Sequence, residues 1–177
     1  MHKPMPTLTV LNECFELGPD GVLTWKKRPL HHFDGDVQWR RWNTRYAGKL
    51  AGFSAKRYRK VAVFDEPYPI SRIIFCMTTG RDPGVDLIDH RDLDGFNNAP
   101  GNLRATDKSG NAQNTGVRSN NKSGIKGVSW SKTKKRWRAR VIRKGQRVEA
   151  LFDALEEAAK FVRAARDGLY GDLSRHI

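Results

Sequence analysis

Short apolar and aromatic runs separated by turn-forming residues fill the first third of the chain. The runs GVLTW, YAGKLAGF and YRKVAVF are broken by Gly, Asp and Pro. Runs of this length between turn residues are typical of short strands. The pattern therefore predicts a β-rich region from Leu8 to about Tyr68.

A continuous apolar segment follows at 70–79, with the sequence ISRIIFCMTT. It is apolar over more than two helical turns, and Gly80 comes directly after it. Because glycine is the usual residue just past the end of a helix, we expect a helix that ends at Gly80.

The next segment has the pattern of a strand, a loop, a second strand and a helix. Val85, Leu87 and Ile88 predict a strand that reaches Asp89 and His90. A second short strand is expected at 103–105. Thr106 or Asp107 could cap a helix over 108–114. This order would bring the start of the helix opposite the end of the first strand.

Apolar and cationic residues alternate with the period of a strand within KRWRARVIRKGQRVEALF. Trp137, Ala139 and Val141 share one face, and arginines occupy the other. The alternation predicts a half-buried strand with a cationic outer face. The arginines of that face are Arg136, Arg138 and Arg140.

Two further strands and a helix are expected around this one. GVSW at 127–130 supplies an earlier strand, and a turn at 144–145 leads to a later strand through 148–150. The residues at 153–156 resemble a capping box, and apolar residues recur at helical spacing from 155 to 165. The pattern predicts three strands packed on one helix.

The charge of the chain favours a polyanionic partner. Its 177 residues include 33 Lys and Arg against 19 Asp and Glu, which gives a formal charge of +14. No Asp or Glu occurs between Val117 and Val148, where basic residues are dense. Such a chain is expected to bind nucleic acid, with an anionic membrane surface as the second choice.

Membrane insertion and secretion are not expected, so we expect a cytoplasmic protein. The most apolar run, at 73–77, is far shorter than the roughly 20 residues of a spanning helix, and MHKPMPT lacks the apolar core of a secretory signal. Cys14 and Cys76 are too few for a disulfide framework or a four-cysteine zinc site. His31 and His32 have no partner at metal-ligand spacing, and we interpret them as loop residues.

The segment at 85–114 carries side chains suited to phosphodiester hydrolysis. That reaction needs an activated water and a cation that stabilises the leaving oxygen. His90 suits proton abstraction, and the oxygens of Asp89 and Asn111 suit Mg²⁺ or Mn²⁺. Because neighbours in a regular strand point to opposite faces, the strand must end or bend at Asp89 and His90.

These residues resemble the HNH nuclease motif, with its ββα-metal fold, in the form found in phage and intron homing endonucleases. The resemblance extends upstream through TWKKRP at 24–29 and WNTRYAGKLAG at 42–52. The residues that carry it are Arg72, Asp89, His90, Asn102, Leu103, Arg104, Asn111 and Asn114.

The resemblance implies a role for each of these side chains. Asp89 and Asn111 would bind Mg²⁺ or Mn²⁺, and His90 would be the general base. Asn102 would fix the loop and the orientation of His90. The expected DNA contacts of this module are Arg72, Arg104 and Asn114.

The C-terminal region resembles the AP2 DNA-binding domain, through SGIKGVSW, KRWRARV and FDALEEAAKFVRAA. The resemblance implies that its sheet lies in the major groove, with strand side chains on phosphates and base edges. Trp137 is expected in the core, whereas Trp130 is left open between core and DNA. The expected DNA contacts are Lys126, Trp130, Lys132, Arg136, Arg138, Arg140, Arg143 and Arg147.

The sequence thus predicts an α+β chain in four parts. These are a β-rich N-terminal region at 1–68, an HNH ββα-metal module at 69–116, a flexible linker at 117–124 and an AP2-like domain at 125–177. The last is expected to be a small three-stranded antiparallel sheet packed on one helix.

The expected function is that of a metal-dependent HNH endonuclease acting on double-stranded DNA, as a free-standing phage homing endonuclease in the host cytoplasm. We expect a monomer without a small-molecule cofactor. Two other functions stay open: a DNA-binding regulator with an inactive HNH site, and a nonspecific nuclease.

Overall fold

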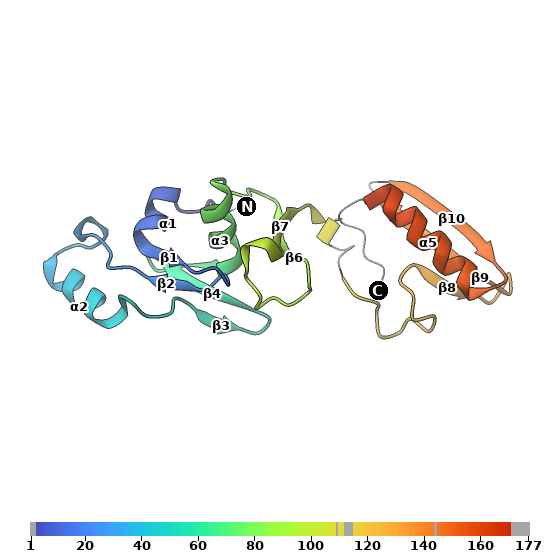
Figure 1. The fold of residues 1–177 in the computed structure, drawn as a ribbon, viewed down its shortest axis with the longest axis horizontal. Coiled ribbons are helices and arrows are strands. Elements are labelled where there is room, and N and C mark those ends of the chain that lie inside the picture. The colour runs from blue at the N-terminus through green and yellow to red at the C-terminus, as the bar shows by residue number, and fades with distance from the viewer. Residues whose placement is uncertain (1–2, 109, 112–114, 144, 171–177) are drawn as a thin grey trace. The chain divides into compact units, whose positions relative to one another are not determined.

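The computed structural model describes residues 3–108, 110–111, 115–143 and 145–170 (Figure 1). Helices and small sheets alternate along the chain, which confirms the predicted α+β class. The chain forms two compact units, Met1–Ala105 and Thr106–Ile177, and each is described by itself. No helix within the described ranges has the length and apolar character needed to cross a membrane.

The first unit contains three short sheets and three α-helices. Strands β1 and β2 pair with each other, β3, β4 and β5 form a second sheet in that order, and β6 pairs with β7. The elements are α1 (Leu8–Cys14), β1 (Phe15–Leu17), β2 (Leu23–Trp25), the 3-10 helix η1 (Leu30–His32), α2 (Asp36–Tyr46), β3 (Phe53–Ala55), β4 (Tyr58–Val63), β5 (Glu66–Pro69), α3 (Ile70–Thr79), β6 (Leu87–His90), the 3-10 helix η2 (Pro100–Asn102) and β7 (Leu103–Thr106).

Helices α1 and α2 lie in a region that the sequence pattern predicted as strands and turns, so that prediction was wrong for these segments. Helix α1 is short, and the Thr7 hydroxyl caps it by accepting a hydrogen bond from the Val10 amide. Helix α2 is polar and buries none of its side chains fully. An Asp36–Arg40 ion pair spans one of its turns. The apolar repeat in each is short: Leu11 and Cys14 are buried in α1, and Trp42 and Tyr46 of α2 are only partly buried against the core.

Helix α3 forms the centre of the first core and confirms the predicted helix at 70–79. It ends where Gly80 adopts a positive φ of 73° and donates its amide to the Cys76 carbonyl. Ile73 and Ile74 are fully buried against residues of α1, β1, β2 and β4. The N-terminal strands and the helix before β6 therefore share one core.

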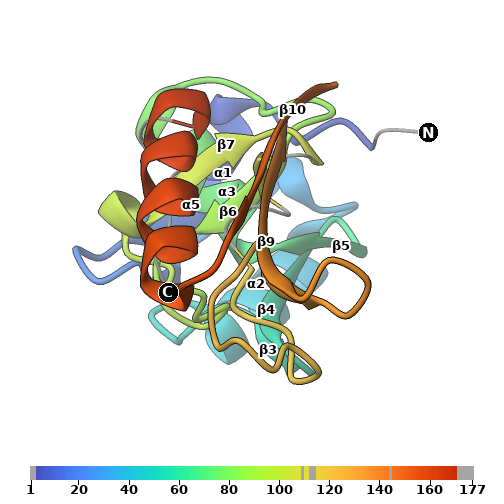
Figure 2. The ribbon, with the colours of Figure 1, turned by 90° about the vertical axis from the view of Figure 1, so that its right-hand side faces the viewer.

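The second unit is a three-stranded antiparallel sheet with α5 along one face (Figures 1 and 2). Its elements are β8 (Val128–Ser131), β9 (Arg136–Arg143), β10 (Gln146–Phe152) and α5 (Leu155–Tyr170), with β9 in the middle. The core contains Val128, Ala139, Val141, Ala158 and Val162. The predicted arrangement of three strands on one helix is confirmed.

Part of the segment predicted as a flexible linker is hydrogen-bonded into the second unit. The Asn121 side chain donates to the Ile125 carbonyl at 2.9 Å. The Ser123 hydroxyl donates to the Val128 carbonyl at 2.8 Å, at the start of β8. Asn, Ser and Gly therefore mark a structured turn here, because their side chains satisfy backbone groups.

Candidate functional site

The strand that carries the candidate catalytic pair ends at His90. The Leu93 amide donates to the His90 carbonyl at 3.1 Å, and Leu93 has a positive φ of 71°. The chain therefore turns directly after β6, and the strand ends at His90, as expected. Asp89 is buried and His90 is half-buried as the last two residues of that strand.

Asp89 is buried and bound by Arg104 across the β6–β7 pair. Its Oδ2 accepts from Nε of Arg104 at 3.0 Å and lies 2.9 Å from Nη2. The side chains are 6% and 12% exposed, respectively. Arg104 thus holds the expected metal ligand in place, and its contact with DNA stays a prediction. A metal ion at Asp89 would have to share this carboxylate with the guanidinium.

His90 is oriented by Asn98, a residue that the sequence did not single out. His90 Nε2 lies 3.2 Å from Oδ1 of Asn98, which is 4% exposed. The Asn98 amide nitrogen donates to the Phe96 carbonyl at 3.1 Å, which fixes Oδ1 as the atom facing His90. Because an amide oxygen only accepts, Nε2 carries the proton and Nδ1 is the basic nitrogen of the neutral ring. No local pattern distinguishes Asn98 from its neighbour Asn97.

Asn102 organises the loop between β6 and β7. Its side chain donates to Oδ1 of Asp92 at 2.9 Å and to the Asn97 carbonyl at 2.8 Å, and it accepts from the Asp92 amide at 3.1 Å. The expected role of fixing the loop fits this geometry, whereas the contact with His90 comes from Asn98. Burial alone would raise the pKa of Asp92, but hydrogen bonds from Asn102, the Asp94 backbone and Asn97 outweigh it and lower that pKa.

Asn111 lies at the start of the helix predicted after β7. Lys108, Gly110 and Asn111 are helical, and the Asp107 carboxylate caps them by accepting from the Gly110 amide at 2.6 Å. Asn111 belongs to the second unit, so its approach to Asp89 stays a prediction. Asn114, another expected DNA contact, lies outside the described residues.

The side chain of Arg72 is hydrogen-bonded to backbone carbonyls of the segment that precedes β6. From α3 it donates to the carbonyls of Asp86 and Gly84, both at 2.8 Å, and it lies 3.5 Å from the Asp82 carboxylate. Its side chain is largely buried. In this arrangement Arg72 positions the segment before β6 and has little surface left for DNA.

The outer face of the C-terminal sheet is cationic, as predicted, but it also has acidic partners. Arg140 lies opposite Glu149 in the β9–β10 register, and Arg147 forms an ion pair with Glu149. Arg147 is the main cause that lowers the pKa of Glu149. Arg136 binds Asp153 with 2.7 Å between Nε and Oδ1. The segment between Val117 and Val148 contains no acid, but Glu149 and Asp153 follow it in sequence and lie beside β9.

Trp130 lies on the helix side of the sheet, away from Arg138 and Arg140. It is directly opposite Trp137 in the β8–β9 register, and paired residues share a face. The two rings are 5.1 Å apart at 70°, and Trp130 is 49% exposed. Trp130 therefore shares the face of Trp137 while its ring stays exposed, and its contact with DNA stays a prediction.

The remaining expected DNA contacts differ in whether their side chains are hydrogen-bonded within the protein or exposed. Lys126 donates to the Thr115 hydroxyl at 3.2 Å, and Arg143 donates to the Leu169 carbonyl near the end of α5. Lys132 and Arg147 are exposed. Arg138 and Arg140 lie on β9, the middle strand of the sheet.

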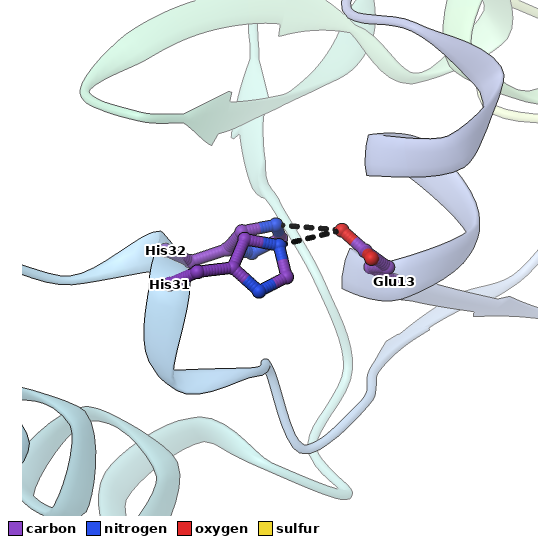
Figure 3. A group of neighbouring side chains, drawn as sticks. All are labelled: Glu13, His31 and His32. Carbon is purple, nitrogen blue, oxygen red and sulfur yellow. Dashed lines mark hydrogen bonds and ion pairs between the residues drawn. The ribbon is translucent and has the colours of Figure 1, made fainter.

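His31 and His32 meet Glu13 from α1, which the sequence did not indicate (Figure 3). Their Nε2 atoms lie 3.3 and 2.8 Å from the same Glu13 oxygen. Nε of Arg28 donates to Nδ1 of His32 at 3.2 Å. That nitrogen is therefore an acceptor, and Nε2 carries the proton that binds Glu13.

This tautomer argues against a metal ion at the cluster. A histidine that binds a metal through Nε2 needs its Nδ1–H directed at an acceptor, and here Nδ1 faces the Arg28 donor. Burial also lowers the pKa of His32, with the Glu13 hydrogen bond opposing it. The interpretation of both histidines as partnerless loop residues was wrong. They belong to a cluster that is held together by hydrogen bonds to Glu13 and Arg28 and not by a metal ion.

Comparison with known proteins gives one informative match. No family model matches the chain, and no solved structure matches it. The chain is 34% identical over 96 residues to protein 3.8 of Escherichia phage T7. The match covers 54% of this chain and 79% of the phage protein. At that identity and coverage, this chain belongs to the same family as protein 3.8 of Escherichia phage T7.

Proposed function

We propose that this chain is a metal-dependent DNA endonuclease of the HNH type with an AP2-like C-terminal module. The observation that carries the proposal is His90 at the end of β6, with its Nε2 held by the buried Asn98 beside the buried Asp89. A histidine fixed in one tautomer next to a carboxylate suits the activation of a water for attack on phosphate.

In the proposed mechanism His90 takes the proton at Nδ1, while Asn98 keeps the ring from rotating. Asn102 keeps the loop from 92 to 97 closed and so holds Asn98 beside His90. Asp89 and Asn111 offer the hard oxygen ligands that Mg²⁺ or Mn²⁺ prefers. A bound divalent ion would stabilise charge on the scissile phosphate and the leaving oxygen.

The second unit would supply DNA affinity through the outer face of its sheet. Arg138 lies opposite Ser129, and Arg140 is exposed beside it. Cationic side chains on a sheet suit contacts with phosphates and base edges. The family relationship to a phage protein supports a phage origin and a place of action in the host cell. We propose on the resemblance of its motifs that the chain is a free-standing homing endonuclease. One catalytic set per chain makes a nick the product expected of a monomer.

A second candidate is a DNA-binding regulator that does not cleave. It is favoured by the Arg104–Asp89 ion pair, because a guanidinium bound to Oδ2 competes with a cation for the same carboxylate. The two candidates share the cationic sheet and differ in whether His90, Asp89 and Asn111 support cleavage.

Incubation of supercoiled plasmid with the full chain in Mg²⁺, Mn²⁺, Zn²⁺ or EDTA tests the proposal. We expect relaxed circles with Mg²⁺ or Mn²⁺, little benefit from Zn²⁺ and no cleavage in EDTA. His90→Ala should lower the rate roughly 10²- to 10⁴-fold. His31→Ala, at an exposed histidine, is the matched control. DNA binding without any nicking under all conditions would favour the regulator, and a map with many equal sites would indicate a nonspecific nuclease.

A further inference from the structure

Arg28 is a buried cation between β2 and η1 in the first unit. It is 5% exposed, and its guanidinium carbon lies 4.7 Å from the ring centres of both Phe33 and Trp42 and 4.9 Å from that of Phe64. Its Nε donates to His32. Across the described ranges, no hydrogen bond or ion pair engages its two terminal nitrogens.

A buried guanidinium with unused donors is costly. Arginine has five N–H donors, and only the one on Nε has a hydrogen-bond partner here. Ring contacts offset part of the lost hydration, but a buried charge ordinarily requires hydrogen-bond acceptors as well. Burial correspondingly lowers the pKa of Arg28. The terminal nitrogens therefore suit a ligand that brings acceptors.

A cavity of about 640 Å³ adjoins this guanidinium. Arg28, Phe33, Trp42 and Phe64 line it together with Phe53, and Phe53 and Phe64 are exposed. This volume is in the range of small-molecule sites, and aromatic walls favour a flat ligand. A planar group meeting the guanidinium edge to edge would lie against the same aromatic walls.

Acceptors also line the cavity, which narrows the ligand chemistry. Asp34, Gln38 and Asp65 are exposed lining residues. A free inorganic anion would be attracted by Arg28 but repelled by the two carboxylates. A flat ligand that presents acceptors on one edge and donors on another would satisfy both kinds of group.

We propose that this cavity binds a guanine base, with Arg28 at its O6 and N7 and a carboxylate of Asp34 or Asp65 at its N1–H and N2 amino group. Arginine meets the O6 and N7 edge of guanine with two hydrogen bonds, whereas adenine has a donor in place of O6. The base could come from a free nucleotide or from an unpaired position in a nucleic-acid strand. The proposal does not depend on the nuclease chemistry of the β6–β7 site.

Isothermal titration of the full chain in EDTA, with GMP, IMP, AMP and inorganic phosphate as separate titrants, tests the proposal. We expect GMP to bind about tenfold or more tightly than AMP, the scale of one two-bond contact to a base. IMP lacks the N2 amino group and should fall between them. Measurable binding of AMP and GMP with equal affinity, or phosphate bound as tightly as GMP, would overturn the assignment.

Point variants of the residues that line the cavity test where GMP binds. Arg28→Met should abolish GMP binding, and thermal melting shows whether that variant folds. Asp34→Asn and Asp65→Asn change exposed residues and should reduce the preference for GMP over IMP in at least one case. Asp20→Asn, at an exposed carboxylate outside the cavity lining, should bind GMP like the parent chain. An unchanged preference in both pocket variants would refute the role of the carboxylates.

A second arm distinguishes the two sources of the base. A DNA duplex with one bulged guanine is compared with the same duplex carrying a bulged adenine, again in EDTA. Preference for the guanine bulge without affinity for GMP indicates a base within a strand, and the reverse indicates a free nucleotide. No preference for guanine in either arm would contradict the proposal, whatever the outcome of the cleavage assays.

Discussion

Breaking the ion pair between Asp89 and Arg104 should destabilise the first unit strongly. Arg104→Met removes the guanidinium and leaves the Asp89 carboxylate, 6% exposed, without the donors at 2.9 and 3.0 Å. Loss of one partner of a buried pair typically costs about 3 to 5 kcal/mol, because the other charge stays buried. The matched control Arg57→Met removes an exposed arginine of the same unit and should change stability by about 0.5 kcal/mol or less.

The measurement is urea unfolding at pH 7 of the parent, Arg104→Met, Asp89→Asn and the double variant. Because both side chains act on each other, the double variant should lose less than the sum of the single losses, by roughly 0.5 to 3 kcal/mol. Additive losses, or an Arg104→Met loss no larger than that of Arg57→Met, would refute the buried pair. That result would also remove the observation that favours a non-cleaving regulator.

Three further predictions concern the general base His90, the DNA-binding surface of the second unit and the dependence of stability on pH. Asn98→Ala should lower the plasmid nicking rate roughly 10- to 100-fold while DNA affinity is kept, because His90 loses the partner that orients it. Arg138→Gln with Arg140→Gln should weaken DNA binding and flatten the salt dependence of log K by about 0.9 per lost phosphate contact. Burial lowers the pKa of His32 in the folded chain, so the unfolded chain binds its proton more readily. The free energy of unfolding should therefore fall as the pH drops below about 6.5, and His32→Gln should reduce that slope.

Each of these has an outcome that contradicts it. Equal losses of binding and nicking in Asn98→Ala would make Asn98 a structural residue only. An unchanged salt slope in the double arginine variant would show that β9 does not face DNA. Identical pH slopes for His32→Gln and the parent chain would place the acid sensitivity elsewhere.

Local periodicity along the chain was enough to predict the secondary structure where a long apolar run or a regular alternation extends over most of an element. The apolar run at 70–79 with its following glycine predicted α3, and the alternation around Ala139 predicted β9 and its arginine face. Both signals arise because burial of one face repeats at the period of the element itself. Helix α2 is polar and only partly buries Trp42 and Tyr46 against the core, and α1 spans only seven residues, so both helices were missed.

The contacts that define the candidate sites were decided by tertiary structure. Asp89 was predicted as a metal ligand and Arg104 as a DNA contact, yet the β6–β7 pairing joins them. Glu13 lies 18 residues before His31 and meets it only because α1 packs beside η1. A sequence pattern reports which face of an element is apolar, but hydrogen bonds and ion pairs depend on which elements the core brings side by side. The residue types of the site were therefore visible in the sequence, while their partners, Asn98 at His90 and Arg28 at the cavity, became visible only in the fold.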